Sequence, residues 1–173
     1  IITYVRRGAI SHRDSVGNEG RTAAGDVQVM SAGRGVYHSE YNHESEDTSL
    51  YQIWIAPNKR GVEPRWDART FPKQDVTDQL PALVSGREEH HGSDALFIYQ
   101  DAAIYGGRLA AGAVVQQPIK YQAYLLVSDG EIEVMGKRIV AGDGAEVVHQ
   151  PLLEIQAITP AEVVVIDVPQ SAM

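Results

Sequence analysis

The sequence contains no cysteine among its 173 residues, and this absence removes three kinds of chemistry at once. Disulfide bonds, thiolate metal ligands and cysteine nucleophiles are all excluded within this chain. Any metal that it binds must therefore be held by imidazole, carboxylate or water. A chain without cysteine also fits a reducing compartment, so we expect a cytoplasmic protein.

Long apolar runs and an excess of basic charge are also missing. No run approaches the ~18 apolar residues that identify a membrane-spanning helix, and the best candidate, 163–166, has the length of a buried strand. The 15 basic residues are outnumbered by 23 acidic ones, which makes the formal net charge −8. Because an acidic chain is poorly suited to neutralising phosphates, we expect neither a membrane nor a nucleic acid as a direct partner.

What the sequence does contain is a series of short alternating runs rich in β-branched and aromatic residues, separated by Gly, Asp and Asn turns. This pattern predicts an all-β protein. A stretch rich in Pro, Gly and charge divides the strands into two groups, and a short helix is expected near 73–80 within it. We predict an N-terminal domain over 1–57, a linker over 58–93 and a C-terminal domain over 94–173. The first group should contain strands at 1–6, 9–14, 26–30, 35–42 and 49–56.

The chain opens inside an expected strand, Ile1-Ile2-Thr3-Tyr4-Val5, and does not begin with methionine. We therefore expect further sequence before Ile1. On this view the first β-barrel is incomplete at its N-terminal side within the 173 residues.

The chemically most informative segment is 25–42, GDVQVMSAGRGVYHSEYN. Side chains alternate between the two faces of a strand, so His38 and Glu40 share one face. Two such ligands on one face can chelate one metal ion. The residues alone leave an alternative open, in which His38 is a core histidine hydrogen-bonded to Glu40 without any metal.

The remaining candidates are weaker. A single strand histidine such as His12 is more often a surface or packing residue, so we do not assign it as a ligand. The histidine at 43 has the wrong parity relative to His38. Aromatic residues near the site offer surface for a flat ligand or packing for the core, and alternation favours the core for Trp54. The other three are Tyr37, Tyr41 and Trp66.

The segment 25–33, followed by His38 and Asn42, resembles the second conserved motif of the cupin superfamily, with Ser31 where that motif usually has proline. Three segments resemble sequences of the pirin family of bicupins. They are MSAGRGVYHSEYN at 30–42, LYQIWI at 50–55 and GVEPRW at 61–66. These segments are especially similar to those of the bacterial members with quercetin 2,3-dioxygenase activity.

This resemblance implies two cupin-type, jelly-roll-like β-barrels and one divalent metal in the first barrel. In the family that metal is usually iron, with nickel, manganese, copper or zinc as alternatives, and its ligands are a His-x-His element plus a histidine and a glutamate. His38 and Glu40 match the last two, whereas the His-x-His element would lie before Ile1. The implied function is oxygenative ring cleavage of a flavonol such as quercetin by dioxygen, with Glu40 also serving as the catalytic base.

Two other functions remain open at this point. Members of the pirin family also act as metal-sensing or redox-sensing regulators that bind a protein partner without turnover. The chain could equally be an inactive scaffold, because two of the family's four ligands fall outside it. The second half has VVQQPIKYQA at 114–123, where a duplicated site would need histidines, so the C-terminal barrel is expected to lack a metal site.

Overall fold

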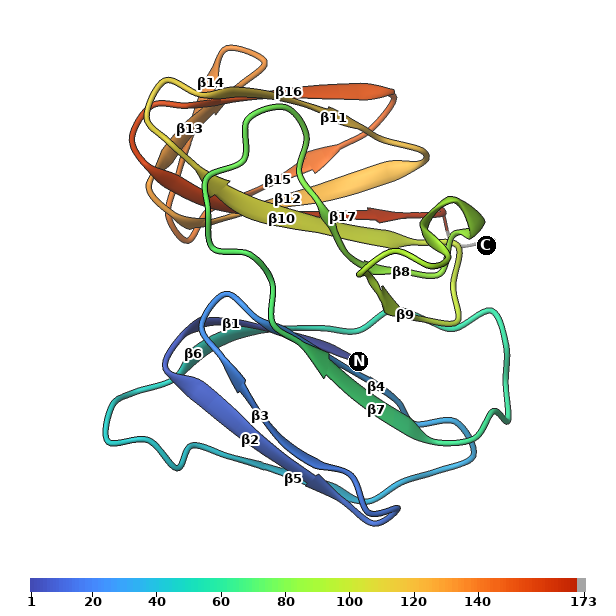
Figure 1. The fold of residues 1–173 in the computed structure, drawn as a ribbon. Helices are drawn as coiled ribbons and strands as arrows, with labels where there is room; N and C mark the ends of the chain where they lie inside the picture. Colours follow the sequence, from blue (N-terminus) through green and yellow to red (C-terminus); the bar gives the residue numbers. More distant parts are fainter. Residues whose placement is uncertain (171–173) are drawn as a thin grey trace. The chain divides into compact units, whose positions relative to one another are not determined.

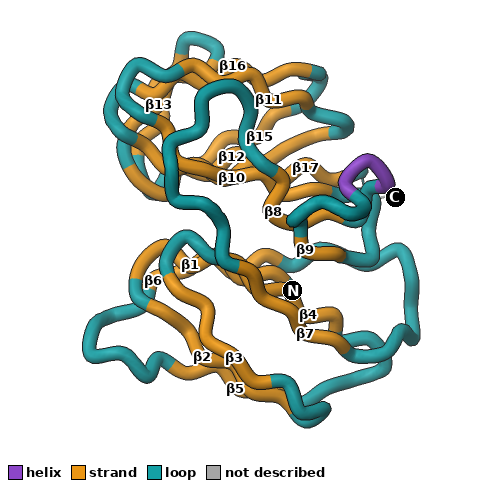
Figure 2. The backbone as a smooth tube through the Cα atoms, viewed as in Figure 1, coloured by secondary structure: helices purple, strands orange, loops and turns teal. Residues whose placement is uncertain are grey.

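The computed structural model describes residues 1–170, and its regular structure is almost entirely β-strand. Figure 2 shows strands throughout the described chain and one short helical turn, η1 (Glu88–His90). This confirms the predicted all-β fold class. Within residues 1–170 no helix has the length and apolar character needed to cross a membrane.

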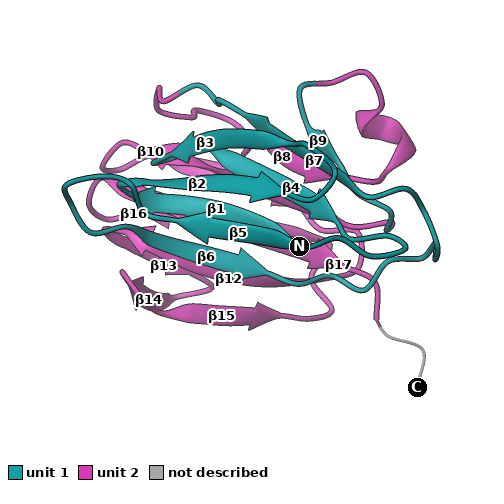
Figure 3. Ribbon diagram, turned by 90° about the horizontal axis from the view of Figure 1, so that it is seen from below, with its two compact units in different colours: residues 1–72, 94–100 teal, residues 73–93, 101–173 magenta. Residues whose placement is uncertain are grey.

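The chain forms two compact units, coloured separately in Figure 3. Unit 1 comprises residues 1–72 and 94–100, and unit 2 comprises residues 73–93 and 101–173. The segment between 72 and 101 is thus shared by the two units. Residues 73–93 belong to unit 2, and residues 94–100 belong to unit 1.

Unit 1 consists of two antiparallel sheets, which Figure 1 shows as separate layers. One sheet has the strand order β6-β1-β4-β7 and the other has the order β3-β2-β5. The strands of the unit, including the short β9, are β1 (Ile2–Arg7), β2 (Ala9–Asp14), β3 (Glu19–Ala23), β4 (Val27–Ser31), β5 (His38–Tyr41), β6 (Ser49–Ile53), β7 (Arg65–Arg69) and β9 (Leu96–Phe97).

Polar side chains line the space between these two sheets. In the first sheet Thr3 lies directly opposite Gln28 on one side and opposite Gln52 on the other, so the three side chains form a row on one face. Thr22 of the second sheet donates a hydrogen bond to Gln28 across the gap, at 3.0 Å. The interior of unit 1 is therefore hydrogen-bonded rather than purely apolar.

The hairpin from β2 to β3 is closed by Asp14. Its carboxylate accepts hydrogen bonds from the backbone N–H groups of Val16 and Asn18, at 3.0 and 2.9 Å, and from the Asn18 side chain at 2.8 Å. A short acidic side chain that bonds its own downstream backbone is a standard way to close a turn. The turn in this way sets the register in which β2 meets its neighbours.

Unit 2 also contains two antiparallel layers. One has the order β15-β12-β17-β10-β8 and the other has the order β11-β16-β13-β14. The strands are β8 (Ala82–Ser85), β10 (Ala103–Leu109), β11 (Val114–Pro118), β12 (Gln122–Asp129), β13 (Glu131–Val134), β14 (Lys137–Val140), β15 (Gly144–Val147), β16 (Leu152–Ala157) and β17 (Ala161–Val168).

The core of unit 2 is mostly aliphatic. Alternate residues of β11 and β16 are buried, including Val115, Leu153 and Ile155, and they join one cluster with Leu125 and Ile132. Each of these five side chains is fully buried. Removing such surfaces from water provides the main favourable free energy of the unit.

Three strands were not expected from the sequence, namely β3, β7 and β8. β3 (EGRTA) and β7 (RWDAR) are rich in polar residues, and they form because they pair with β2 and β4 rather than because of local propensity. The helix predicted near 73–80 is absent from the structure. The expectation that Trp54 belongs to the core is also wrong, since its side chain is 72% exposed.

Candidate functional site

The two predicted ligands, His38 and Glu40, both lie on the short strand β5. His38 and Glu40 are two residues apart on this strand and so point to the same face. The His38 residue is exposed, whereas only 19% of the Glu40 side chain is exposed. His38 is therefore not the core histidine of the alternative interpretation.

Strand β2 brings a second pair of side chains to the same face. His12 lies directly opposite Glu40, and Asp14 lies directly opposite His38. Paired residues of an antiparallel sheet share a face, so four ionisable side chains gather there. Nε2 of His12 is 3.3 Å from Oδ2 of Asp14, and Nδ1 of His12 is 4.0 Å from Oε1 of Glu40.

His12 is the centre of a stack of three aromatic rings. Its ring lies 5.7 Å from the ring of His38, with 20° between the planes, and 5.0 Å from the indole of Trp66, with 8° between the planes. The side chain of His12 is only 1% exposed. The stack thus runs from the half-buried indole of Trp66, through the buried ring of His12, to the exposed imidazole of His38.

The position of Trp66 depends on a glycine in β3. A Cβ atom added to Gly20 would lie 2.2 Å from the Cη2 atom of Trp66, which is far inside any allowed contact. Gly20 is also the residue paired with His12. The absence of a side chain at Gly20 therefore lets the indole lie flat beneath the imidazole of His12.

Both oxygens of the Glu40 carboxylate accept hydrogen bonds from glutamine side chains. Nε2 of Gln28 donates to Oε1 in a short contact, and Nε2 of Gln52 donates to Oε2 at 3.2 Å. The amide oxygens of these glutamines accept in turn from the Thr22 hydroxyl and from the Trp54 indole N–H, at 3.0 and 3.1 Å. All donors in this chain point toward Glu40, so its carboxylate is held in one orientation.

Asp14 is the acid whose pKa departs most clearly from its ordinary value at this site. Burial by itself raises the pKa of the carboxyl, but hydrogen bonds from Asn18, His12 and Val16 outweigh that effect and lower the pKa to about 2. The carboxylate is therefore ionised, and accepts hydrogen bonds only, throughout the neutral range.

The donor chemistry of His38 and Glu40 suits a first-row divalent metal, since imidazole nitrogen and carboxylate oxygen are common ligands for such ions. No group of three or more His, Asp or Glu side chains with metal-binding geometry occurs among residues 1–170. His38 and Glu40 could therefore supply two ligands of a metal ion, and water, substrate or further protein donors would need to occupy its remaining coordination positions.

A cavity of about 390 Å³ lies in unit 1, but neither predicted ligand lines it. It adjoins the first residues of β1 and the ends of β4 and β6. Trp54 belongs to its wall and is joined to Glu40 through the side chain of Gln52. The lining residues are Ile1, Ile2, Met30, Ser31, Ala32, Gly33, Trp54, Ile55, Pro57, Lys59, Arg60, Gly61, Val62, Ile98, Tyr99 and Gln100.

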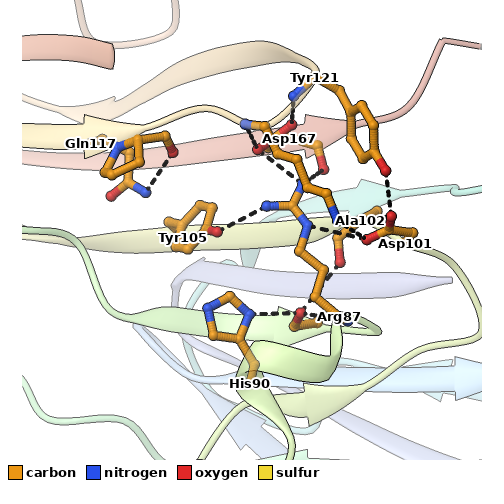
Figure 4. A network of polar contacts seen from close by, with 11 residues as sticks. Arg87, His90, Asp101, Ala102, Tyr105, Gln117, Tyr121 and Asp167 are labelled. Carbon is orange, nitrogen blue, oxygen red and sulfur yellow. Dashed lines mark hydrogen bonds and ion pairs between the residues drawn. The ribbon is translucent and has the colours of Figure 1, made fainter. Parts of the chain in front are cut away.

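Unit 2 has a polar cluster of a different kind, shown in Figure 4. The guanidinium of Arg87 is 2.9 Å from the carboxylate of Asp167 and donates a hydrogen bond to the hydroxyl of Tyr105 at 3.1 Å. Asp167 also accepts from the backbone N–H groups of Lys120 and Tyr121. The charges of this cluster neutralise one another inside the unit.

The other histidines do not join the first site. The exposed ring of His43 stacks on Tyr41, and Nδ1 of His90 lies 2.8 Å from Oγ of Ser85 in unit 2. Gln28 and Gln52 were not predicted as partners of Glu40, and His12 was considered a surface or packing residue and not a part of the site. The sequence does show that His12 and Asp14 share one face of a strand. It does not show that this strand, β2, pairs with β5, and that pairing is what brings them to His38 and Glu40.

The fold and this site define a cupin-type protein whose candidate metal-binding face lies in the N-terminal unit. A family model for pirin matches residues 1–55, and a model described as the quercetinase C-terminal cupin domain matches residues 83–168. The chain belongs to the pirin family.

Individual relatives agree with this assignment. The chain is 48% identical over 170 residues to a Pseudomonas aeruginosa protein with a provisional quercetin 2,3-dioxygenase name, a match that covers 97% of the chain and 72% of the relative. It is 35% identical over 172 residues to the quercetin 2,3-dioxygenase of Escherichia coli, covering 98% and 72%. Among solved structures, the Escherichia coli pirin YhhW in complex with nickel(II) superposes with a TM-score of 0.85 at 32% identity, covering 97% and 71%.

Proposed function

We propose that the protein is a metal-dependent dioxygenase that acts on flavonols such as quercetin, with its metal bound at His38 and Glu40. The observation that carries the proposal is the face of β5, where an exposed imidazole stands two residues from a carboxylate held by Gln28 and Gln52. The names of the relatives support the substrate class.

Iron is the metal that we propose, with nickel, manganese, copper and zinc as the alternatives to be tested. The nickel complex of YhhW supports a divalent ion in the family. When bound, such an ion supplies Lewis acidity to adjacent substrate oxygens and open positions for exchangeable ligands. His38 and Glu40 would provide two of its ligands, and water, substrate or further protein donors would fill the remaining positions.

Glu40 is the residue that we assign to proton transfer. A flavonol must lose its hydroxyl proton to become a better chelator and a more electron-rich ring, and a carboxylate oxygen beside that hydroxyl accepts the proton. The hydrogen bonds from Gln28 and Gln52 hold the carboxylate in place, so little reorientation is needed when the substrate arrives. Dioxygen is then the oxidant of the ring cleavage.

We also propose that the metal site belongs to the N-terminal domain alone and that the C-terminal domain has a structural role. The cluster around Arg87 supports this division, because its cation is already paired with Asp167 inside unit 2. The aliphatic core of that unit supports it as well.

The first experiment measures metal per chain by elemental mass spectrometry on protein purified without chelator or histidine tag. Quercetin consumption and oxygen uptake are then followed together. About one metal per chain is expected, and it should be lost in His38→Ala. Glu40→Gln should reduce turnover by about 100-fold or more, because it removes both a ligand and the base.

The control variant is His43→Ala, which removes an exposed histidine of the same unit whose ring stacks on Tyr41. It should retain both metal and turnover. A metal-loaded protein that consumes no flavonol would instead favour the regulatory alternative, in which the metal acts on binding to a protein partner. Absence of metal after reloading would contradict the site itself.

A further inference from the structure

His12 and Asp14 lie directly opposite the two proposed metal ligands in the pairing of β2 with β5, and no step of the proposed function uses them. Both side chains are 1% exposed. Burying a histidine and an aspartate together is costly unless each finds a partner. Asp14 has several partners, but His12 has a hydrogen bond at only one of its two ring nitrogens.

The hydrogen bonds determine which nitrogen of His12 carries the proton in the neutral ring. Asp14 accepts hydrogen bonds from its neighbours, so the contact at 3.3 Å requires N–H at Nε2 of His12. Nδ1 is then the other nitrogen, and it is buried without a hydrogen-bond partner. Its nearest ionisable neighbour is Oε1 of Glu40, at 4.0 Å, which is beyond hydrogen-bond distance.

The ring of His12 also limits the orientation of His38. The two rings lie nearly parallel, and Trp66 supports the opposite face of His12 at an angle of only 8°. A ring held on one face by an indole and at one edge by a carboxylate has little freedom to rotate. His38 therefore rests on a rigid surface, although its own outer side is exposed.

We propose that His12, held by Asp14, is a positioning residue for the metal site, orienting His38 through ring stacking. The inference rests on the proposed function, since it assigns His12 a role toward one of the two proposed ligands. Side chains that orient ligands without touching the metal commonly change metal affinity by about 10- to 100-fold when they are replaced.

A purely packing role predicts a different result from the same substitution. His12→Phe keeps a flat ring between Trp66 and His38 but removes both nitrogens. If His12 only fills space, this variant should bind metal as the wild type does. If the hydrogen bond from Nε2 to Asp14 fixes the plane of the ring on which His38 stacks, affinity should fall although the stack is still occupied.

The experiment titrates Ni²⁺ alone into metal-free protein in competition with a chromophoric chelator, and records the visible spectrum of the Co²⁺-loaded protein. His12→Phe should bind Ni²⁺ about 10- to 100-fold more weakly and shift the cobalt bands, which report ligand geometry. His43→Phe is the matched control, because it makes the same change at an exposed histidine of the same unit. It should match the wild type in both measurements.

Asp14→Asn is the second variant and decides the question if His12→Phe does not fold. It replaces the Oδ2 acceptor with an N–H donor, so the ring loses the partner that holds Nε2–H, and Ni²⁺ affinity should again fall. Wild-type affinity in a folded His12→Phe or Asp14→Asn protein overturns the inference but leaves the proposed function intact. If the wild type itself binds no Ni²⁺, or if His38→Ala binds it equally well, the proposed metal site fails instead.

Discussion

The two units differ in the polar side chains that they bury and in how these are partnered. Between its sheets unit 1 buries polar side chains, namely Thr3, His12, Thr22 and Gln28, each at most 3% exposed. Unit 2 surrounds its centre with aliphatic residues such as Leu125, which is fully buried. Unit 2 buries polar side chains as well, among them Arg87 and Asp167, but these two pair with each other. This contrast supports the proposal that the metal site lies in unit 1.

The charged groups of the units differ in the same way. In unit 2 the cation of Arg87 is 2% exposed and meets the carboxylate of Asp167, while the half-exposed Asp101 binds Lys120 and Tyr121. The hydrogen bond from Tyr121 is the main cause of the lowered pKa of Asp101. These contacts form a closed network in which each charge meets an opposite charge. In unit 1, by contrast, the imidazole of His38 is exposed.

The largest effect is expected from breaking the closed network of unit 2. Asp167→Ala leaves the guanidinium of Arg87 buried without its carboxylate, which should lower the free energy of unfolding by about 3–5 kcal/mol. Urea denaturation followed by circular dichroism measures the change. Asp143→Ala, an exposed acid of the same unit, should change stability by less than about 0.5 kcal/mol. Equal stability of the two variants would mean that the network is not a structural element.

A smaller effect is expected from crowding the ring stack of unit 1. Gly20→Ala forces a methyl group into Trp66, and overpacking of this kind costs about 1–3 kcal/mol. Gly144→Ala is the control in unit 2, because the ring that its Cβ would meet belongs to Tyr124, which is 47% exposed and free to turn. Thermal unfolding should separate the two variants, and the intrinsic fluorescence of Trp66 should change only in the first.

Removing one buried hydroxyl should affect the site more than the fold. Thr22→Val keeps the shape of the side chain but leaves the amide oxygen of Gln28 without its donor, at a cost of about 1 kcal/mol. Because Gln28 holds Glu40, Ni²⁺ affinity should also fall, by up to about 10-fold. Thr70→Val, at an exposed threonine of unit 1, is the control. A change in stability with wild-type Ni²⁺ affinity would separate the interior of unit 1 from its site.

The smallest effect concerns acid stability. The pKa of Asp14 is about 2 in the folded protein against an ordinary value of 3.8. Since the folded value is the lower one, the stabilisation by Asp14 is present above pH 4 and is lost as the pH falls toward 2. Asp14→Asn should therefore flatten this part of the curve of unfolding free energy against pH. An unchanged slope in the variant would show that Asp14 contributes nothing to it.

Much of the fold was predictable because strand formation leaves a local record. Alternation predicted that His38 and Glu40 share one face of a strand, and the structure has both residues on strand β5. It failed for Trp54, which has the same parity as Gln52 of β6 and, like Gln52, is exposed. The strands β3 and β7 were missed because their residues are mostly polar, and pairing rather than composition makes them strands.

Three properties follow from the sequence alone: the all-β class, the acidic and cysteine-free character of the chain, and the face shared by His38 and Glu40. Each follows from composition or from a period of two residues. Which distant side chains reach that face depends on the tertiary structure. His12 arrives through the register of β2 with β5, and Gln28 and Gln52 arrive through two strands that flank β1. Register is a long-range property, because the pairing that lowers the free energy depends on the turns and interior of the whole unit and not on any one strand.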